Sequence, residues 1–270
     1  MIVDGKKIAA EIVTELKKRP RPDKFLAAIL VGEDPASVSF LNQKKKIADE
    51  LGVDFRLYKF PETVTQDELR KEVLIVADQA ACGGIIVQLP LPAAIDPRPV
   101  LDAIPPSKDP DVLGSEAKKA FENGAGPVLP PAAGVVETVI QNTKYKIPNT
   151  KVAVLGLGFL VGRPVANWAK GKFKEVSLLD KGDNFSVLKN ADIVVCGTGV
   201  PGLVKPEMLK ENALVIDFGY GQNDGKPSGD FSADTKYEIL NTIYYTPTPG
   251  GTGPILVAKL FENFYKLNAS

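Results

Sequence analysis

Two alternating patterns of hydrophobic positions predict an α/β fold for this chain. Short apolar runs are typical of strands covered on both faces, as in parallel sheets. Such runs lie at residues 25–31, 84–87, 152–155, 176–180, 191–197 and 213–219. Apolar residues at helical spacing predict helices at residues 4–18, 37–51, 65–79, 135–142, 163–169 and 255–267. Helix-like segments are also expected between the last three strands.

A glycine-rich turn follows the apolar run at 152–155, with glycines at positions 156, 158 and 162. Glycine lets the backbone turn sharply and approach a pyrophosphate closely, and the start of the following helix offers free N–H donors. Asp180 ends the next strand, where a ribose-binding carboxylate is expected. The pattern favours a Rossmann dinucleotide-binding unit over a glycine-turn layer that binds no nucleotide.

The length of 270 residues allows two domains, each with its own core. We expect a nucleotide-binding domain at 134–253 and a second domain formed by 1–133 with 254–270. Residues 128–134 are expected to form a linker, and residues 221–229 a polar surface loop.

Charge and composition narrow the class of partner. Lys plus Arg equals Asp plus Glu, at 33 each, so no overall basic field attracts nucleic acid or an anionic membrane. A small-molecule partner is therefore expected. Cys82 and Cys196 lie in apolar runs, which indicates buried thiols in a reducing compartment and no metal site. The chain shows neither a signal-peptide pattern nor an apolar run of about 18 residues, so a cytoplasmic protein is expected.

The chain contains no histidine, so a proton-transfer step falls to another side chain, with a tuned lysine favoured. Lys44 lies on the apolar stripe of the helix at 37–51. Spacing alone favours a snorkelling lysine whose ammonium reaches water, with a desolvated lysine of lowered pKa as the alternative. Gln88 ends a buried strand, where it either meets a ligand or satisfies loop backbone. Asp109 and Asp111 lie in a proline-containing loop and are more often turn formers than ligand-binders.

Several motifs together carry a family resemblance. These are Val87-Gln-Leu-Pro-Leu-Pro92, Lys44, Lys108-Asp109 and Pro249-Gly-Gly-Thr-Gly-Pro254. With them the chain resembles the bifunctional methylenetetrahydrofolate dehydrogenase/cyclohydrolase family over nearly its whole length. The resemblance implies two α/β domains around a cleft, the second a Rossmann domain, and a homodimer. It also implies oxidation of 5,10-methylenetetrahydrofolate with a nicotinamide cofactor, followed by hydrolysis to 10-formyltetrahydrofolate.

The resemblance also implies roles for individual residues. Lys44 would be the cyclohydrolase lysine, Gln88 would hold and tune it, and Asp111 would bind the pterin edge as a third residue of the catalytic group. The implied substrate-binding residues are Phe40, Val87, Leu89, Asp109, Pro249, Gly250, Gly251, Thr252 and Gly253. The implied cofactor-binding residues are Gly156, Leu157, Gly158, Gly162, Asp180, Lys181 and Tyr220.

The chain departs from the family pattern at several positions. Phe40 replaces the usual tyrosine, and Lys-Asp-Pro-Asp-Val at 108–112 replaces K-D-V-D-G. Leu157 replaces an arginine of the cofactor turn, and Asp180-Lys181 replaces a histidine-serine pair. Asp180 would repel a 2′-phosphate and accept a hydrogen bond from a free ribose hydroxyl, so NAD is favoured over NADP. A dehydrogenase of another pterin or small substrate and a non-catalytic folate- or nucleotide-binding protein are the alternatives.

Overall fold

The chain forms two compact units in a computed structural model that describes every residue except 144, 146–148, 224, 234–237 and 270. We call residues 1–9 and 132–256 the first unit, and residues 10–131 and 257–270 the second unit. This division differs from the expected domains mainly at residues 1–9, which belong with 132–256.

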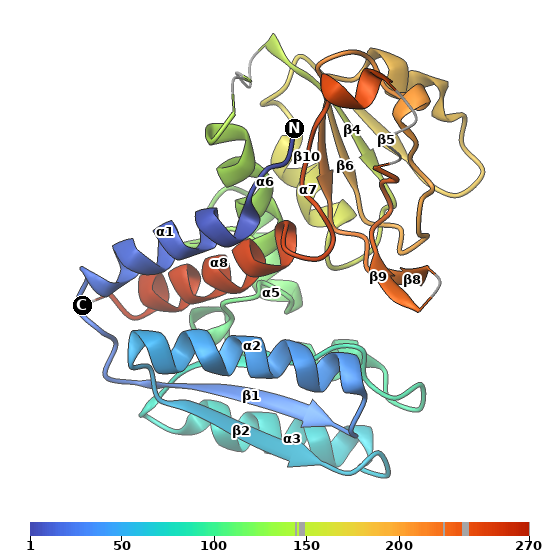
Figure 1. Cartoon of the computed structure of the whole chain (residues 1–270). Helices are drawn as coiled ribbons and strands as arrows, with labels where there is room; N and C mark the ends of the chain where they lie inside the picture. Colours follow the sequence, from blue (N-terminus) through green and yellow to red (C-terminus); the bar gives the residue numbers. More distant parts are fainter. Residues whose placement is uncertain (144, 146–148, 224, 234–237, 270) are drawn as a thin grey trace. The chain divides into compact units, whose positions relative to one another are not determined.

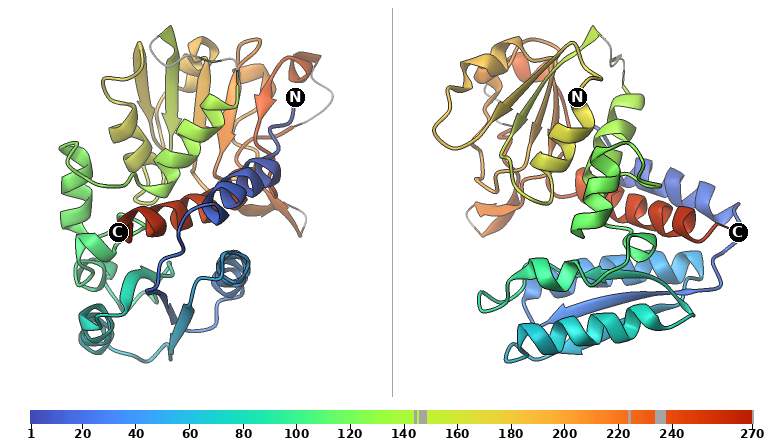
Figure 2. Two further views of the ribbon diagram at one scale, coloured as in Figure 1. Left: turned by 90° about the vertical axis from the view of Figure 1, so that its left-hand side faces the viewer. Right: turned by 180° about the vertical axis from the view of Figure 1, so that it is seen from behind.

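The second unit is built on a three-stranded parallel sheet (Figure 1). Its strands are β1 (Phe25–Val31), β2 (Phe55–Phe60) and β3 (Cys82–Val87), in the order β2-β1-β3. Every β1 residue is buried because this strand is central and helices cover it. Helices α2 (Pro35–Leu51) and α3 (Gln66–Asp78) lie on opposite faces of the sheet (Figures 1 and 2), as right-handed crossovers require for this strand order. The short helices α4 (Pro97–Leu101) and α5 (Ser115–Glu122) follow β3 in the chain.

Local signals of the sequence set the ends of these helices. Asp34 caps α2, with its side chain accepting the Ser37 N–H. Thr65 and Glu68 form the expected capping box at the start of α3. The predicted strand at 25–31 and the helix predicted at 65–79 are confirmed, because their signals lie within a few residues of the chain.

The first unit carries a five-stranded parallel sheet. Its strands are β4 (Lys151–Leu155), β5 (Glu175–Leu179), β6 (Ile193–Cys196), β7 (Leu214–Asp217) and β10 (Tyr244–Tyr245), in the order β10-β7-β6-β4-β5. Helix α7 (Gly162–Ala169) connects β4 to β5, as expected. This parallel sheet, with the glycine turn after β4, has the architecture predicted for the nucleotide-binding unit.

Some sequence-based expectations for the first unit are wrong. The connections from β5 to β6 and from β6 to β7 contain only the 3₁₀ turns Phe185–Asn190 and Pro206–Met208, because they are short and broken by glycine or proline. The expected loop at 221–229 contains an antiparallel hairpin, β8 (Gly221–Asn223) with β9 (Lys226–Ser228).

Two further helices begin earlier than predicted. Helix α6 (Pro131–Gln141) takes up half of the expected linker, and α8 (Thr252–Leu267) begins three residues early. A proline lies in the first turn of each helix, where its missing N–H costs nothing. No helix in the described part of the chain is long and apolar enough to cross a membrane.

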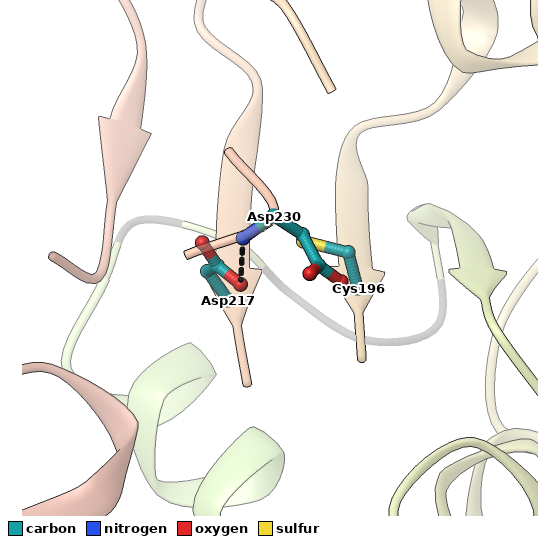
Figure 3. A group of neighbouring side chains, drawn as sticks. All are labelled: Cys196, Asp217 and Asp230. Carbon is teal, nitrogen blue, oxygen red and sulfur yellow. Dashed lines mark hydrogen bonds between the residues drawn. The ribbon is translucent and has the colours of Figure 1, made fainter. Parts of the chain in front are cut away.

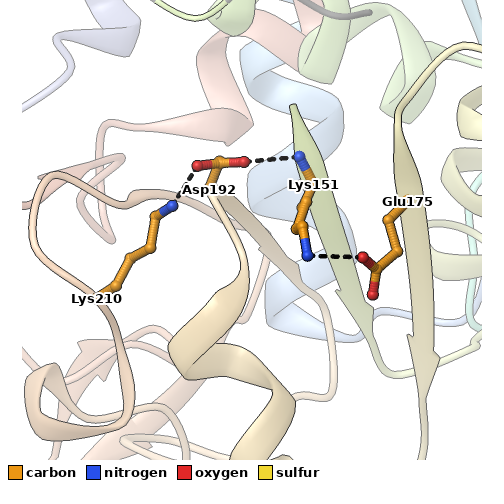
Figure 4. Close-up of polar contacts among 4 residues, drawn as sticks. All are labelled: Lys151, Glu175, Asp192 and Lys210. Atoms are coloured by element: carbon orange, nitrogen blue, oxygen red, sulfur yellow. Dashed lines mark hydrogen bonds and ion pairs between the residues drawn. The ribbon is translucent and has the colours of Figure 1, made fainter. Parts of the chain in front are cut away.

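A polar network holds the amino ends of the first unit's strands (Figure 4). The Asp192 carboxylate accepts the backbone N–H of Lys151 at 2.7 Å and pairs with the Lys210 ammonium, while the Lys151 ammonium pairs with Glu175 at 2.9 Å. Lys151 begins β4, Glu175 begins β5 and Asp192 immediately precedes β6, whereas Lys210 lies in the connection that leads to β7. The opposite, carboxyl edge of the sheet carries the glycine turn and Asp180.

Candidate active site

Lys44 is the buried lysine of helix α2, and only 9% of its surface is exposed. Its ammonium donates a hydrogen bond to Gln88 Oε1 at 3.1 Å. The snorkelling interpretation favoured by spacing is therefore wrong, because the ammonium does not reach water but ends in a buried polar contact. Helical periodicity correctly placed Lys44 on the apolar face, but it could not show that this face contains a hydrogen-bond partner for the ammonium.

Gln88 is positioned to receive this lysine. Its backbone N–H donates to Ile29 O at 2.9 Å, which continues the β1–β3 ladder by one residue. Its side-chain Nε2 donates to Leu89 O at 2.8 Å. Because the amide nitrogen is bound there, Oε1 is directed at Lys44, an acceptor facing a group that can only donate.

Burial shifts the pKa values of Lys44 and of Asp111, its charged neighbour. Burial lowers the pKa of Lys44, and the charge of Asp111 opposes that shift. Burial also raises the pKa of Asp111, opposed by the charge of Lys44. Phe40, half-buried, lies one helical turn before Lys44 on α2. The arrangement combines a lysine of lowered pKa, a carboxyl group whose charge interacts with that of the lysine, and an amide that binds the lysine nitrogen.

The loop that carries Asp111 is fixed at its start by Lys108 and Asp109. The Lys108 ammonium donates to Ala77 O at 2.6 Å and Gln79 O at 3.2 Å, at the carboxyl end of α3. Asp109 is 1% exposed, and its Oδ2 accepts the Leu113 N–H at 2.9 Å and the Gly114 N–H at 2.8 Å.

Asp109 consequently forms the turn through Oδ2, and its expected substrate contact stays a prediction. Burial raises the pKa of Asp109 to about 7, against the effect of the Gly114 N–H. The other acid of the pair, Asp111, is the one whose charge acts on Lys44.

The glycine turn of the first unit has the close backbone contacts that its spacing predicts. Gly156 has a φ of +86°, in the left-handed region that favours glycine. A Cβ atom at Gly162 would lie 1.8 Å from Gly156 O, so only glycine allows the turn to close against the start of α7. A Cβ atom at Gly158 would meet nothing within 4 Å. The turn therefore leaves open space beside the amino end of a helix, which suits a pyrophosphate.

Three further cofactor candidates follow strands of this sheet at its carboxyl edge. Asp180 comes directly after β5 and is exposed, and its Oδ1 accepts the Lys181 N–H at 2.9 Å. Lys181 is exposed as well, and Tyr220, just beyond β7, is 60% exposed. Arg163, at the start of α7, contacts the glycine turn: its Nε donates to Leu157 O at 3.1 Å. Arg163 is thus a charged neighbour of the turn that the sequence-based assignment did not include.

Asp217, the last residue of β7, organises the loops at this edge (Figure 3). Its Oδ1 accepts the N–H groups of Gly219 and Asp230, and its Oδ2 accepts that of Phe231. The Thr252 hydroxyl donates to Asp217 O at 2.7 Å. This hydroxyl attaches the start of α8 to β7, and the substrate contact expected of Thr252 stays a prediction.

The glycines of the same loop differ in the space around them. Gly250 has a φ of +99°, and a Cβ atom at Gly251 would lie 2.5 Å from Pro247 O. A Cβ atom at Gly253 would meet nothing within 4 Å. Pro249 is exposed. The loop is therefore tightly folded at Gly251 and open at Gly253.

Cys196, Asp217 and Asp230 place one possible metal-ligand atom each within 4.8 Å of one another (Figure 3). Two observations favour an anchoring role over metal binding. Backbone N–H groups bind both Asp217 oxygens, and the Thr198 hydroxyl donates to Asp230 Oδ2 at 2.8 Å. Burial raises the pKa of the Cys196 thiol.

Two family models cover most of the chain. The catalytic domain of tetrahydrofolate dehydrogenase/cyclohydrolase matches residues 3–111, and the NAD(P)-binding domain of the same enzyme matches residues 130–270. The chain belongs to the tetrahydrofolate dehydrogenase/cyclohydrolase family. The predicted membership is thus confirmed, and with it the prediction of two α/β domains of which one is Rossmann-like.

Similar proteins agree over nearly the full length. The bifunctional protein FolD of Halothermothrix orenii is 36% identical over 278 residues, which cover 98% of this chain and 96% of that protein. The crystal structure of a bifunctional FolD methylenetetrahydrofolate dehydrogenase/cyclohydrolase from Campylobacter jejuni has a TM-score of 0.93 at 30% identity, and the match covers 99% of this chain and 98% of that one. The FolD structure from Trypanosoma brucei, complexed with NADP and an inhibitor, has a TM-score of 0.90 at 29% identity, with 99% and 96% covered.

Family membership gives a function to the domain that contains the glycine turn. The NAD(P)-binding model spans Gly156 to Gly162 and Asp180, so the first unit binds a nicotinamide cofactor, as predicted. The sequence-based assignment missed Asp217 and Asp230, which shape the loops beside this site. An acid at the end of the apolar run 213–219 was the available signal for Asp217.

Proposed function

We propose that the protein oxidises 5,10-methylenetetrahydrofolate to the methenyl form and then hydrolyses that product to 10-formyltetrahydrofolate. The observation that carries the proposal is the buried Lys44–Gln88 contact with Asp111 as the charged neighbour. The nicotinamide cofactor supplies a hydride acceptor for the first step. The second step needs a group that gives and takes protons while water adds to the cationic methenyl carbon.

Lys44 has the properties that the second step requires. Its lowered pKa makes the neutral amine accessible, so the amine can accept the proton that leaves the attacking water. The resulting ammonium can then return a proton to the folate nitrogen as the carbon–nitrogen bond breaks, while the added hydroxyl releases its proton to solvent and becomes the formyl carbonyl. Gln88 Oε1 holds the nitrogen in place throughout. Phe40 provides an aromatic face without a hydroxyl, so this proton chemistry rests on Lys44 and Asp111.

The test is Lys44→Met, with Lys45→Met as the matched control on the same helix. Lys45 is exposed and pairs with Asp49 at 2.9 Å. We expect Lys44→Met to lower methenyl hydrolysis by at least about 100-fold while hydride transfer stays measurable, since general acid–base catalysis contributes roughly 10²–10⁴. Absorbance reports both the formation and the decay of the methenyl product. Hydrolysis that survives in Lys44→Met would refute the role of Lys44, and a wild-type enzyme without turnover would refute the function.

We propose NAD as the preferred cofactor. Asp180 follows β5 at the carboxyl edge of the sheet, and its Oδ1 already accepts the Lys181 N–H. Its remaining oxygen suits a ribose hydroxyl and repels a 2′-phosphate. The positive charges of Lys181 and Arg163 act against this preference, because they attract a 2′-phosphate. A clearly higher kcat/KM with NADP would overturn the preference, and Asp180→Ser should shift selectivity toward NADP.

We also propose that Pro249, Gly250 and Gly253 border the folate, supported by the open space at Gly253. The family resemblance supports a homodimer, which light scattering of the purified protein tests. A reducing, cytoplasmic compartment is supported by the free, buried thiols of Cys82 and Cys196.

A further inference from the structure

Asn263 of helix α8 is a buried amide that neither the family motifs nor the proposed mechanism uses. It is 2% exposed. Its Nδ2 donates to Pro110 O at 2.8 Å and to Leu129 O at 2.7 Å. Both amide hydrogens are thus directed at backbone carbonyls more than a hundred residues earlier in the chain.

The Pro110 carbonyl belongs to the peptide group that joins Pro110 to Asp111. Holding that oxygen fixes the plane of the peptide immediately before Asp111, the acid whose charge acts on Lys44. On the other side of Asp111, the Leu113 and Gly114 N–H groups are bound by Asp109. Asp111 is therefore flanked by a restraint on each side.

The backbone between these restraints is strained. Val112 has a φ of +55°, and for a β-branched residue the left-handed region costs about 1–2 kcal/mol. The Val112 side chain packs with Ala117 and Val128 in a small buried cluster. A loop in this conformation relaxes unless neighbouring contacts hold it.

We propose that Asn263 is a positioning residue for Asp111, fixing the Pro110 carbonyl so that the Asp111 carboxylate keeps the place from which its charge acts on Lys44. Asn263 acts through the loop and does not touch the substrate. The inference deepens the proposed function and rests on it for the role of Asp111.

The chain offers a matched control on the same segment. Asn268 Nδ2 likewise donates to two backbone carbonyls, those of Gly83 at 3.0 Å and Phe264 at 2.8 Å. Gly83 lies at the amino end of β3, the end opposite Gln88. Asn268→Leu therefore removes the same kind of contact without touching the Asp111 loop.

The kinetic test is a double-mutant cycle of Asn263→Leu with Asp111→Asn. We expect Asn263→Leu to lower kcat/KM for the folate substrate by about tenfold, a typical coupling for residues in one network. The effect should vanish when Asp111 is already Asn, and the KM for the dinucleotide should stay unchanged. Asn268→Leu should change kcat/KM less than about twofold. Equal effects of Asn263→Leu with and without Asp111 would overturn the proposal.

A second measurement does not depend on activity. Amide hydrogen exchange in 112–114 should accelerate at least about tenfold in Asn263→Leu and stay unchanged in Asn268→Leu. Unchanged exchange in both variants overturns the proposal, even when the wild type turns over. A wild type without turnover refutes the proposed function separately. If Asn263→Leu does not fold, Asn263→Ser, which retains one donor, provides the comparison with a smaller expected effect.

Discussion

Asp109→Asn is predicted to make this protein more stable at alkaline pH. In the folded chain Asp109 is 1% exposed, and burial raises its pKa from the ordinary value of 3.8 to about 7. An acid with a higher pKa in the folded state binds its proton more tightly there than in the unfolded chain. The contribution of Asp109 to the free energy of unfolding is therefore highest below pH 3.8, and it declines as the pH rises toward 7. Asparagine keeps an oxygen for the Leu113 and Gly114 N–H groups and never ionises.

The magnitude follows from the two pKa values. Each tenfold change in proton affinity corresponds to 1.36 kcal/mol, so the rise from 3.8 to about 7 amounts to about 4 kcal/mol of lost stability above pH 8. Of this loss in stability, about 2.5 kcal/mol occurs between pH 5 and pH 8, because the rest has already occurred below pH 5. The new amide nitrogen replaces Oδ1, which is buried without a partner in the described part of the chain. That exchange costs about 1–3 kcal/mol at every pH.

Urea unfolding at pH 5, 6, 7 and 8 measures the prediction for wild type and variant in parallel. The free energy of unfolding of the wild type should fall by about 2.5 kcal/mol more than that of the variant across this range. Asp217, whose pKa burial raises to about 6, also lowers stability over this range, but it is present in both proteins and cancels. A difference between the two proteins that stays constant with pH would refute the account of Asp109.

Three other predictions concern the fold and the cofactor turn. Gly162→Ala places a Cβ atom 1.8 Å from Gly156 O, so dinucleotide affinity measured by fluorescence titration should fall at least about tenfold, and an unchanged Kd would contradict the steric reading. Asp192→Ala should cost about 1–3 kcal/mol in urea unfolding at pH 7. Burial acts to raise the pKa of Asp192, but the N–H and ammonium groups around it hold that pKa below 3.8, so the cost should shrink as the pH falls below about 4. Thr65→Ala removes half of the capping box and should lower the unfolding free energy by about 1 kcal/mol, with no change expected in the KM of either substrate.

The sequence by itself determined the features whose signals are local. Gly156 and Gly162 mark the turn because only glycine meets its backbone demands, and Thr65 with Glu68 marks the start of α3 because a capping box closes within four residues. Helical spacing also placed Lys44 on the buried face of α2. These patterns depend only on residues close together in the chain, so they can be recognised without any knowledge of tertiary contacts.

Only the tertiary structure decided what those positions do chemically. Periodicity shows which face a side chain occupies, but the partner of Lys44 lies 44 residues away and the carbonyl bound by Asn263 lies 153 residues away. Asp109 and Asp111 are two positions apart in the same loop, yet the Asp109 carboxylate binds the backbone of its own turn, whereas the charge of Asp111 acts on Lys44. Burial and charge at these sites arise when distant segments pack together, and a pKa follows from that packing and not from the residue type.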